Sequence, residues 1–450
     1  MKKLIVLFII TIVAHGFISC EDQLNLKDPS ALGTDNFIFD GESALSAMLD
    51  GYNDMQGDAT GAYVTGAYPR MMQGLYSDDL LHPGSFPTLD EALVNNFQAN
   101  NINVSRLFNQ HYDLINTGTE VMRLTQELDP ETEIDPELQS QIIAECHAMR
   151  AYGYLQLVKI FGGLPITELT YPLDGDAAND TPRSSEADVY AYILSEIQLA
   201  EGKLNPNNPV TQFTNDAVQV MKAEAYLFQE NYTAVENTLT PLIGDYSLTE
   251  TYAEVFDLNA LENSTAIMRL NLNAADGGDL QLFFTSSGRR EVSPSQSLVN
   301  AFEPNDSRLE LISNPDDPTT SFINKFRSNT SFFPYIYRYE DVLFMYAEVL
   351  ARRNSPEAAT YLNLIRERAG LGPIGAFNAS NVASVIAQER RVEFYGEIDR
   401  WETVKRLGLA QQVISSKGIT FTNRQLLWPI PQDEINRNAL ISQADQNPGY

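Results

Sequence analysis

Residues 144–152 read Ala-Glu-Cys-His-Ala-Met-Arg-Ala-Tyr, and two later stretches share their pattern: Met-Lys-Ala-Glu-Ala-Tyr at 221–226 and Met-Tyr-Ala-Glu-Val at 345–349. Each stretch puts small residues beside aromatic ones within a helical pattern. Small residues let helices approach closely while neighbouring aromatic side chains fill the gaps, as in stacked tetratricopeptide hairpins. The copies are irregularly spaced, so we predict a degenerate array, a mainly α protein with a tetratricopeptide-like α-α superhelix.

Start and stop signals for further helices agree with this fold class. Asp135 and Ser355 each stand before a proline, which places a capping side chain ahead of proline at the first helical position. Gly370 and Gly408 follow predicted helices, where glycine is a common stop. The clearest predicted helices span residues 104–127, 136–161, 186–203, 215–229, 232–243, 339–353, 356–369 and 382–407.

Two long stretches between these helices lack regular periodicity, about residues 56–101 and 245–335. The first is rich in Gly, Tyr, Asp and Asn. In the second, Ala266, Met268, Leu270 and Leu272 alternate with other residues ahead of an Asp-Gly-Gly-Asp turn at 276–279, a pattern typical of a small β hairpin. Long irregular segments on a rigid helical scaffold often carry binding sites, so we expect the ligand site there.

The first 19 residues have the form of a signal peptide. Lys2 and Lys3 precede an apolar run over 4–13, which is about half of the roughly 20 residues needed to cross a bilayer. Cys20 follows the small residue Ser19, as at a bacterial lipidation site, although a chance cysteine in an ordinary secreted protein gives the same pattern. We predict a lipoprotein signal peptide over 1–19, lipidation of Cys20, a tether over 20–36 and a single α-superhelical domain over 37–450. Two or three acyl chains on one residue anchor a protein stably.

The charge of the chain excludes some partners. With 30 basic and 60 acidic residues the formal net charge is −30. Nucleic-acid binding relies on Lys and Arg to neutralise phosphates, so we predict no nucleic-acid partner. Adsorption to anionic lipid is disfavoured for the same reason.

Common catalytic and metal-binding patterns are missing from the sequence. His82, His111 and His147 show no ligand-type spacing, so we predict no metal, and no cofactor motif is present. The oxygen-rich loop at 174–180 suggests calcium, but it fails the EF-hand spacing. Cys146 is the one cysteine left after lipidation, and its helical setting predicts a buried apolar role.

Glu389, Glu393 and Glu397 fall on one face of a predicted helix. Such carboxylates can be interpreted as a glycosidase pair. However, the sequence interleaves these glutamates with Arg390, Arg391 and Arg400. Cations at such short range keep carboxylates ionised. We therefore predict a structural ion-pair network at this face.

Both tryptophans, Trp401 and Trp428, lie near the C-terminus in segments that favour the core. A stacking platform for a ligand must then use Tyr or Phe. The irregular regions offer Tyr63, Tyr68, Phe86, Phe97, Phe283, Phe284, Phe332, Phe333 and Tyr335.

Several distinct motifs follow one another along the C-terminal third. They are Val-Leu-Phe-Met-Tyr-Ala-Glu at 342–348, Leu-Asn-Leu-Ile-Arg-Glu-Arg-Ala-Gly-Leu at 362–371, Glu-Arg-Arg-Val-Glu-Phe at 389–394 with Asp-Arg-Trp at 399–401, Leu-Trp-Pro-Ile-Pro at 427–431 and Gln-Asn-Pro-Gly-Tyr at 446–450. Upstream, Phe-Gly-Gly-Leu-Pro at 161–165 and Asp-Ser-Arg at 306–308 fit the same series. In this combination the chain resembles the SusD/RagB family of outer-membrane lipoproteins of Bacteroidetes.

The resemblance implies a helical scaffold of the tetratricopeptide type at the cell surface. It also implies a non-catalytic protein that captures glycans or other oligomers and caps a SusC-like TonB-dependent transporter. Glu21-Asp22, just after the predicted lipidated cysteine, is similar to the acidic signal that directs such lipoproteins to the outer face. The implied location is therefore the cell outer membrane, with the protein anchored by lipid and exposed at the surface.

The ligand residues are predicted in part from the resemblance. Some family members use an aromatic residue and an asparagine shortly before the helix matching residues 107–124, and Phe97 and Asn101 fall there, with Phe where those members have Trp. We expect Tyr or Phe stacking and Asn, Asp or Arg hydrogen bonds in a shallow site made by the two irregular regions. The candidate ligand-binding residues are Phe97, Asn101, Tyr68, Arg70, Phe284 and Tyr335.

An oligosaccharide is the expected ligand, with three alternatives. The same scaffold can bind oligopeptides, as RagB-type proteins do. It can also serve only as a protein-protein scaffold. A glycosidase would need two carboxylates facing one pocket.

Overall fold

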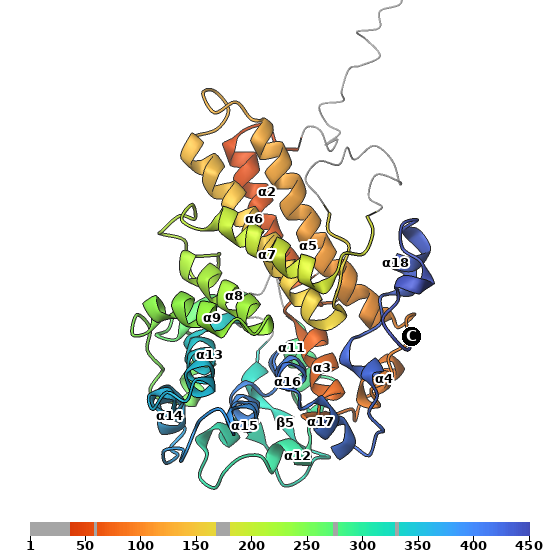
Figure 1. Cartoon of the computed structure of the whole chain (residues 1–450), viewed down its shortest axis with the longest axis vertical. Helices are drawn as coiled ribbons and strands as arrows, with labels where there is room; N and C mark the ends of the chain where they lie inside the picture. Colours follow the sequence, from red (N-terminus) through yellow and green to blue (C-terminus); the bar gives the residue numbers. More distant parts are fainter. Residues whose placement is uncertain (1–36, 58–60, 168–180, 273–277, 329–332) are drawn as a thin grey trace, which may run out of the picture.

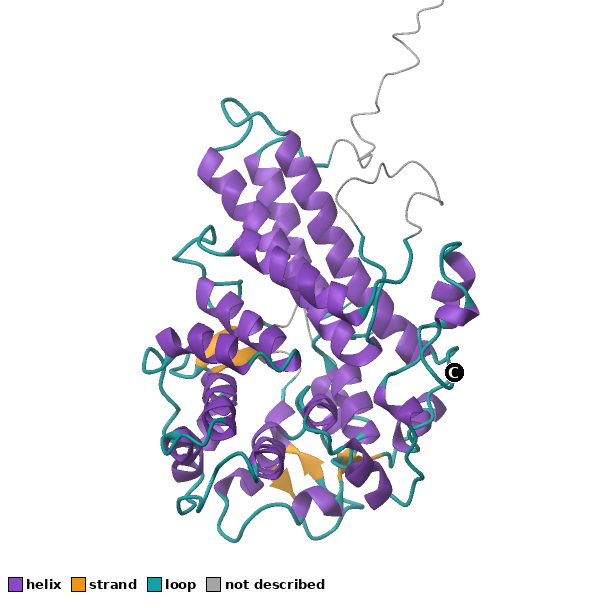
Figure 2. Cartoon of the chain, in the orientation of Figure 1, coloured by secondary structure: helices purple, strands orange, loops and turns teal. Residues whose placement is uncertain are grey.

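The computed structural model describes residues 37–57, 61–167, 181–272, 278–328 and 333–450. The predicted signal peptide, Cys20, the tether over 20–36 and the loop at 174–180 lie outside these residues. Helices dominate the described residues and the strands are short (Figure 2). The prediction of a mainly α fold is confirmed.

Four long helices form the bundle at the top of Figure 1: α2 (Gly41–Gln56), α5 (Ile102–Glu127), α6 (Pro136–Phe161) and α7 (Glu186–Ala200). α6 packs against both α5 and α7, and α2 packs against α5 and α6. A Cβ at Gly153 on α6 would lie 2.7 Å from Ile115 Cγ1 on α5, so glycine is required at this close approach. Ala144, Ala148 and Ala151 of the quoted stretch are fully buried, as their predicted packing role demands.

Two further helix pairs continue the array: α8 (Asn215–Phe228) with α9 (Tyr232–Leu239), and α13 (Tyr339–Arg352) with α14 (Ala358–Arg368). α9 also packs on α13, which joins the two pairs side by side. Ala223, Ala225 and Ala347 from the other two stretches are fully buried at these contacts. The superhelix of helical hairpins is therefore built as the sequence predicts.

Local helix signals agree with the structure at most ends. Asp135 Oδ1 accepts hydrogen bonds from the N–H groups of Glu137 and Leu138, which caps α6 as predicted. Gly370 and Gly408 have φ of +76° and +74°. α14 begins two residues later than predicted, and α9 ends in a short 3-10 segment, η3 (Thr240–Leu242).

The single predicted helix over 382–407 is wrong. The segment contains α15 (Val382–Phe394) and α16 (Arg400–Arg406), separated by a turn in which Gly396 has φ of +74°. A side chain in this left-handed region is strained, and a Cβ here would also lie 3.0 Å from Ile323 Cδ1. The turn lets α16 pack on α3 while α15 packs on α13.

The two stretches predicted to be irregular contain short elements. The first holds α3 (Ala67–Tyr76), which is almost entirely buried, and α4 (Pro87–Leu93). The second holds α10 (Tyr252–Val255), α11 (Leu280–Phe284), α12 (Gln296–Val299), η4 (Ser307–Leu311) and η5 (Asn324–Phe326). The C-terminal segment adds α17 (Ala410–Ser416), η6 (Asn423–Leu426), α18 (Gln432–Arg437) and η7 (Gln443–Asp445).

Three two-stranded antiparallel sheets complete the fold. β1 (Leu80–Leu81) pairs with β3 (Ser293–Pro294), β2 (Ala266–Arg269) with β6 (Tyr335–Arg338), and β4 (Ile312–Ser313) with β5 (Phe322–Ile323). The strand predicted at Ala266 is present, but the local hairpin over 276–279 is wrong. Its partner is β6, and α11 follows the predicted turn instead of a returning strand.

One hydrophobic core runs from Ile38 to Ile430. Trp401 and Trp428 are fully buried within it, as predicted. The backbone N–H of Trp428 donates to the carbonyl of Ile160, which fastens the C-terminal segment to the end of α6. Within the described residues, no helix has the length and apolarity needed to cross a membrane.

Candidate functional site

The two long connecting regions predicted to form the site lie against each other. β1 of the first pairs with β3 of the second. The Asp279 carboxylate accepts a hydrogen bond from Ala67 N–H (3.0 Å) at the first turn of α3, and Glu291 Oε1 accepts hydrogen bonds from the N–H groups of Ser85 (2.8 Å) and Phe86 (3.0 Å). Segments about 200 residues apart are thus held together by a strand pairing and by hydrogen bonds from backbone N–H groups to carboxylates.

Four rings from these regions form a continuous series, which we call the aromatic row: Tyr63, Tyr68, Phe283 and Phe86. Tyr63 and Tyr68 stack with ring centroids 4.1 Å apart, and Tyr68 meets Phe283 edge-on at 5.5 Å. Phe283 in turn meets Phe86 edge-on at 6.0 Å. The two edge-on contacts lie within the range of about 4.5–7 Å at which aromatic pairs attract, and the stacked Tyr63–Tyr68 pair is closer still.

Two members of the aromatic row reach the protein surface. Tyr68 and Phe86 are partly exposed, whereas Tyr63 and Phe283 are buried and support them. Burial raises the pKa of Tyr68, so its hydroxyl stays protonated at neutral pH and can donate a hydrogen bond. The arrangement offers a ligand an apolar face with a polar edge.

Arginines lie at both ends of the aromatic row. Arg289 Cζ is 4.0 Å above the Phe86 ring, and its side chain is 45% exposed. Arg106 Nη1 donates to the Tyr63 hydroxyl (3.4 Å), with its Cζ 6.0 Å from that ring. A guanidinium presents several hydrogen-bond donors in a fixed plane, which suits recognition of ligand oxygens beside the rings.

Of the six predicted ligand residues, Tyr68 belongs to this surface. Arg70 is buried, and its Nε and Nη2 donate to the carbonyl of Thr65 (3.2 and 3.1 Å). Phe284 is 1% exposed and packs edge-on against Phe326 at 4.9 Å. Arg70 and Phe284 therefore have interior partners, although both come from the regions predicted to bind.

Phe97, Asn101 and Tyr335 also have structural partners. The Phe97 ring has no exposed surface and stacks on Tyr76 at 5.3 Å. Asn101 Oδ1 caps α5 by accepting from Asn103 N–H (2.9 Å), and the Tyr335 hydroxyl donates to the carbonyl of Val255 (2.9 Å). The Phe97 and Asn101 side chains are therefore buried, whereas that of Tyr335 remains partly exposed.

Phe86 and Arg289 were absent from the six candidates, and local sequence signals for them are weak. Phe86 precedes Pro87 at the start of α4, which predicts an extended residue but not an exposed ring. Arg289 follows Gly288 in a loop. The β1–β3 pairing and the hydrogen bonds from Ser85 and Phe86 to Glu291 bring Phe86 and Arg289 together, and these contacts have no signal within either segment.

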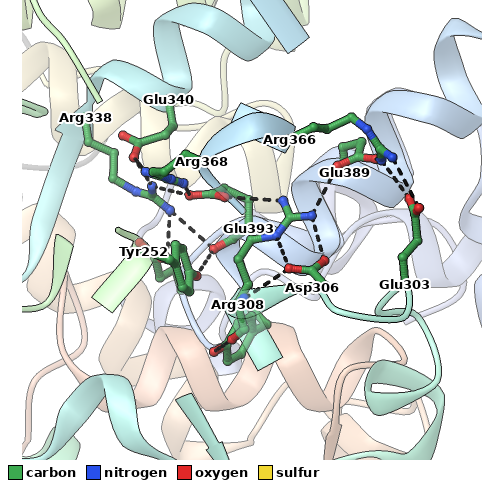
Figure 3. Close-up of polar contacts among 12 residues, drawn as sticks. Tyr252, Glu303, Asp306, Arg308, Arg338, Glu340, Arg366, Arg368, Glu389 and Glu393 are labelled. Atoms are coloured by element: carbon green, nitrogen blue, oxygen red, sulfur yellow. Dashed lines mark hydrogen bonds and ion pairs between the residues drawn. The ribbon is translucent and has the colours of Figure 1, made fainter. Parts of the chain in front are cut away.

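The carboxylate face of α15 is a buried charge network (Figure 3). Glu393 Oε1 lies 2.6 Å from Arg338 Nη1 and 2.6 Å from Arg368 Nη2, and Glu393 Oε2 lies 3.4 Å from Arg308 Nη1. Burial alone would raise the pKa of Glu393, but Arg368, Arg338 and Arg308 hold that pKa well below its usual range. The predicted ion-pair network is present.

The partners in this network differ from the prediction. Glu389 pairs with Arg366 and Arg308, and Glu397 pairs with Lys325 and Arg338. The neighbouring arginines face other carboxylates: Arg390 contacts Asp341 and Asp399, Arg391 contacts Asp78 and Asp79, and Arg400 contacts Asp78 and Asp79. Residues adjacent on a helix point to different sides, so the cations interleaved in sequence cannot all reach the Glu face.

A cavity of about 90 Å³ adjoins this network and is lined by several carboxylates, including Glu224, Glu397, Asp399 and Glu402. Each of them has a cationic partner, such as Lys159, which lies 2.7 Å from Glu224 and 2.6 Å from Glu402. Ligand pockets usually have volumes of about 300–1,000 Å³. The cavity is too small for a sugar ring and its charges are already neutralised.

The histidines and the cysteine have structural contacts. His111 Nδ1 lies 2.7 Å from the carbonyl oxygen of Leu107, and His147 Nδ1 lies 3.0 Å from Glu196 Oε2. Cys146 is fully buried, and burial raises the pKa of its thiol. Across the described part of the chain, no group of three or more His, Cys, Asp or Glu side chains is placed to hold a metal ion.

The fold belongs to the class of helical-hairpin scaffolds that carry long connecting segments between their helices. Two family models match the chain: one described as "SusD family" over residues 317–450 and one described as "Starch-binding associating with outer membrane" over residues 22–227. Together they match more than half of the chain. The chain belongs to the SusD/RagB family.

Full-length relatives and solved structures agree with this membership. SusD-like protein P38 of Formosa agariphila is 25% identical, with 95% of this chain and 96% of that protein covered. A SusD superfamily protein from Bacteroides vulgatus superposes with a TM-score of 0.81 at 20% identity, covering 91% of this chain and 99% of the other. A laminarin-binding SusD-like protein superposes with a TM-score of 0.79 at 20% identity, covering 92% of this chain and all of the other. Likeness at this identity establishes a shared fold.

Proposed function

We propose that this chain is a non-catalytic cell-surface glycan-binding lipoprotein that captures oligosaccharides and delivers them to a SusC-like TonB-dependent transporter. The observation that carries the proposal is the aromatic row, which presents Tyr68 and Phe86 at the surface with Arg289 beside them. It is formed where the two connecting regions meet, beside α5 of the helical scaffold.

The chemistry of the aromatic row suits a sugar. One face of a pyranose ring carries C–H groups that pack on an aromatic face, while its hydroxyls need donors and acceptors at the edge. The Tyr68 hydroxyl and the Arg289 guanidinium provide those groups. Names of similar proteins support this ligand class: one solved neighbour is laminarin-binding, and another is a surface glycan-binding protein A from Bacteroides thetaiotaomicron in complex with laminarihexaose.

The anchor and the transporter are supported by sequence and family. Cys20 follows a signal-peptide pattern, and Glu21-Asp22 stands directly after it. The family description over residues 22–227 refers to association with the outer membrane. A lipid tether that leaves the folded domain at the outer face would hold the binding surface where it can meet both glycan and transporter.

The surroundings of the α15 carboxylates support the non-catalytic role that we propose. A glycosidase needs one carboxyl that donates a proton and another that acts as nucleophile or base. Glu393 is completely buried among arginines that keep it ionised, so it cannot serve as the acid. The nearby cavity is too small to hold a sugar ring.

A glycan array tests the proposal. The mature chain from Glu21 onward, without Cys20, is applied to printed oligosaccharides beside a Tyr68→Ala/Phe86→Ala variant and a Phe39→Ala control, whose ring is 63% exposed outside the aromatic row. We expect wild type and control to bind the same oligosaccharides and the double variant to lose them. Binding to a peptide library but to no glycan would instead favour the oligopeptide-binding alternative.

A further inference from the structure

A cleft in the surface lies beside α5 and is formed by residues outside the aromatic row. The cleft has a volume of about 740 Å³ and lies between α5, the segment around Pro165 and Thr167, and α18. Its volume falls within the range of about 300–1,000 Å³ typical of small-molecule sites. Its lining includes Asn109, Tyr112 and Asn116 from α5, with Glu434 and Arg437 from α18.

Tyr112 provides a rigid aromatic wall in this cleft. Its ring lies 4.7 Å from Phe108 and edge-on to Tyr154 at 6.1 Å, and it remains partly exposed. Its hydroxyl donates to the carbonyl of Pro165 (2.7 Å), which fixes the ring direction. A ring held in this way can pack against a ligand without a large loss of side-chain entropy.

The polar groups of the cleft fall on one face of α5. Asn109, Tyr112 and Asn116 are spaced by three and four residues, so they project from the same side of the helix. Within the described ranges, neither Asn109 nor Asn116 makes a hydrogen bond through its side-chain amide. Each amide can therefore donate and accept toward a ligand.

The opposite wall is also fixed and carries a guanidinium. Asn438 Nδ2 donates to the carbonyl of Thr181 (3.0 Å) and to Glu434 Oε1 (2.9 Å), which holds α18 against the cleft. Arg437 Nε donates to the carbonyl of Asp433 (3.3 Å). In the part of the chain that the structure describes, Arg437 has no carboxylate partner, so its terminal nitrogens are open to a ligand.

We propose that this cleft is a second sugar-binding subsite, which takes one or two neutral sugar units. Groups that both donate and accept match sugar hydroxyls, and Tyr112 matches the C–H face of a pyranose. Glu434 and Asp113 also line the cleft and offset the charge of Arg437, which disfavours an anionic ligand. The inference rests on the proposed function for its ligand class, but on separate residues.

Helix α5 carries residues that contact both sites. Arg106, which contacts Tyr63 of the aromatic row, and Asn109 of the cleft lie one helical turn apart on α5. Two linked contacts on one chain raise the affinity above that of either alone. The cleft would therefore increase the affinity for longer oligosaccharides.

The test uses the mature chain with three matched variants. The cleft variant is Asn109→Ala/Asn116→Ala/Arg437→Ala, which alters side chains that reach solvent. Its control is Asn436→Ala. Asn436 is an exposed residue of α18, next to Arg437, and does not line the cleft. The third variant is Tyr68→Ala/Phe86→Ala. All are first compared on a printed oligosaccharide array, and the glycan that wild type binds most strongly is then titrated by calorimetry.

We expect the cleft variant to bind that glycan about tenfold more weakly, with unchanged melting temperature, while Asn436→Ala binds like wild type. Complete loss of binding in the cleft variant also supports the subsite. Wild-type affinity in the cleft variant, with loss in Tyr68→Ala/Phe86→Ala, overturns the subsite and leaves the proposed function standing. If wild type binds no glycan on the array, both are overturned.

Discussion

The buried charge network around Glu393 and the aromatic row around Tyr68 are both assembled from distant segments, but they differ in what they leave open. In the network, Arg308, Arg338 and Arg368 all have carboxylate partners and almost no solvent exposure. Beside the aromatic row, the Arg289 side chain is 45% exposed, and its Nη2 lies 3.6 Å from Glu291 Oε1.

The difference shows how one strongly acidic chain uses arginine in two ways. Inside, arginine neutralises carboxylates that would otherwise be costly to bury. At the surface, arginine lies over a ring with donors left for a ligand. Stability and binding should therefore depend on separate residues, and mutations can test this separation.

The largest expected effect is the loss of stability in Glu393→Gln. Removing the shared carboxylate leaves three buried guanidiniums short of a partner, and breaking a buried ion pair costs about 3–5 kcal/mol. Urea unfolding should show this loss, whereas Glu310→Gln, at an exposed position on η4, should stay within about 0.5 kcal/mol of wild type. A loss below about 1 kcal/mol for Glu393→Gln would mean that the network contributes little.

Phe97→Ala should also destabilise the fold, by about 3–4 kcal/mol, because it empties a fully buried site between Tyr76 and Trp428. The remaining folded protein should keep wild-type glycan affinity. Unfolding curves combined with calorimetry below the melting temperature measure both quantities. Weaker binding with little loss of stability would instead place Phe97 in the ligand site.

Acid should weaken the network in a defined direction. The pKa of Glu393 is lowered in the folded protein, so its stabilising contribution is present above the unfolded value of about 4.3 and is lost as the pH falls below it toward the folded value. The free energy of unfolding of wild type should thus fall more steeply below about pH 4 than that of Glu393→Gln. Parallel curves for the two proteins would contradict the lowered pKa.

The aromatic row should affect binding with a small effect on stability. Tyr68→Ala/Phe86→Ala is expected to weaken glycan binding by about tenfold or more, equivalent to about 1.4 kcal/mol. Both rings are partly exposed, so the melting temperature should change much less than in Phe97→Ala. Calorimetry and a thermal melt on the same sample compare the two effects.

The smallest expected effect is that of Arg289→Ala. Loss of the guanidinium over Phe86 removes hydrogen-bond donors at the edge of the platform and should weaken glycan affinity by about threefold to tenfold, since such bonds are worth roughly 1 kcal/mol. Arg289→Lys keeps the charge but not the planar fork, so an intermediate affinity is expected. Tighter binding in Arg289→Ala would show that the guanidinium blocks the ring.

Local signals predicted the helices well. Asp135 before Pro136 marks the start of α6, and the predicted bounds of this helix match the structure. The break at Gly396 was missed because a glycine inside a helical pattern costs only about 1 kcal/mol, and here packing against Ile323 decides the conformation. The hairpin failed because Ala266 pairs with Arg338, more than 70 residues away.

The candidate site was less predictable than the fold. Tyr68 was predicted because aromatic residues in long connecting segments often bind ligands, and it lies at the surface in the aromatic row. Phe97 comes from the same region, but whether a ring points inward depends on the tertiary core, which placed Phe97 against Trp428. Phe86 and Arg289 become neighbours through the β1–β3 pairing and the hydrogen bonds of Glu291 to Ser85 and Phe86, which sequence patterns do not encode locally.

The most direct test of the proposed function measures glycan affinity and unfolding free energy together for Glu393→Gln and Tyr68→Ala/Phe86→Ala. We predict that Glu393→Gln loses about 3–5 kcal/mol of stability and keeps its affinity while folded. We predict that the double aromatic variant keeps most of its stability and loses about tenfold or more in affinity. Unchanged glycan affinity in the double aromatic variant would contradict the assignment of the aromatic row as the binding surface.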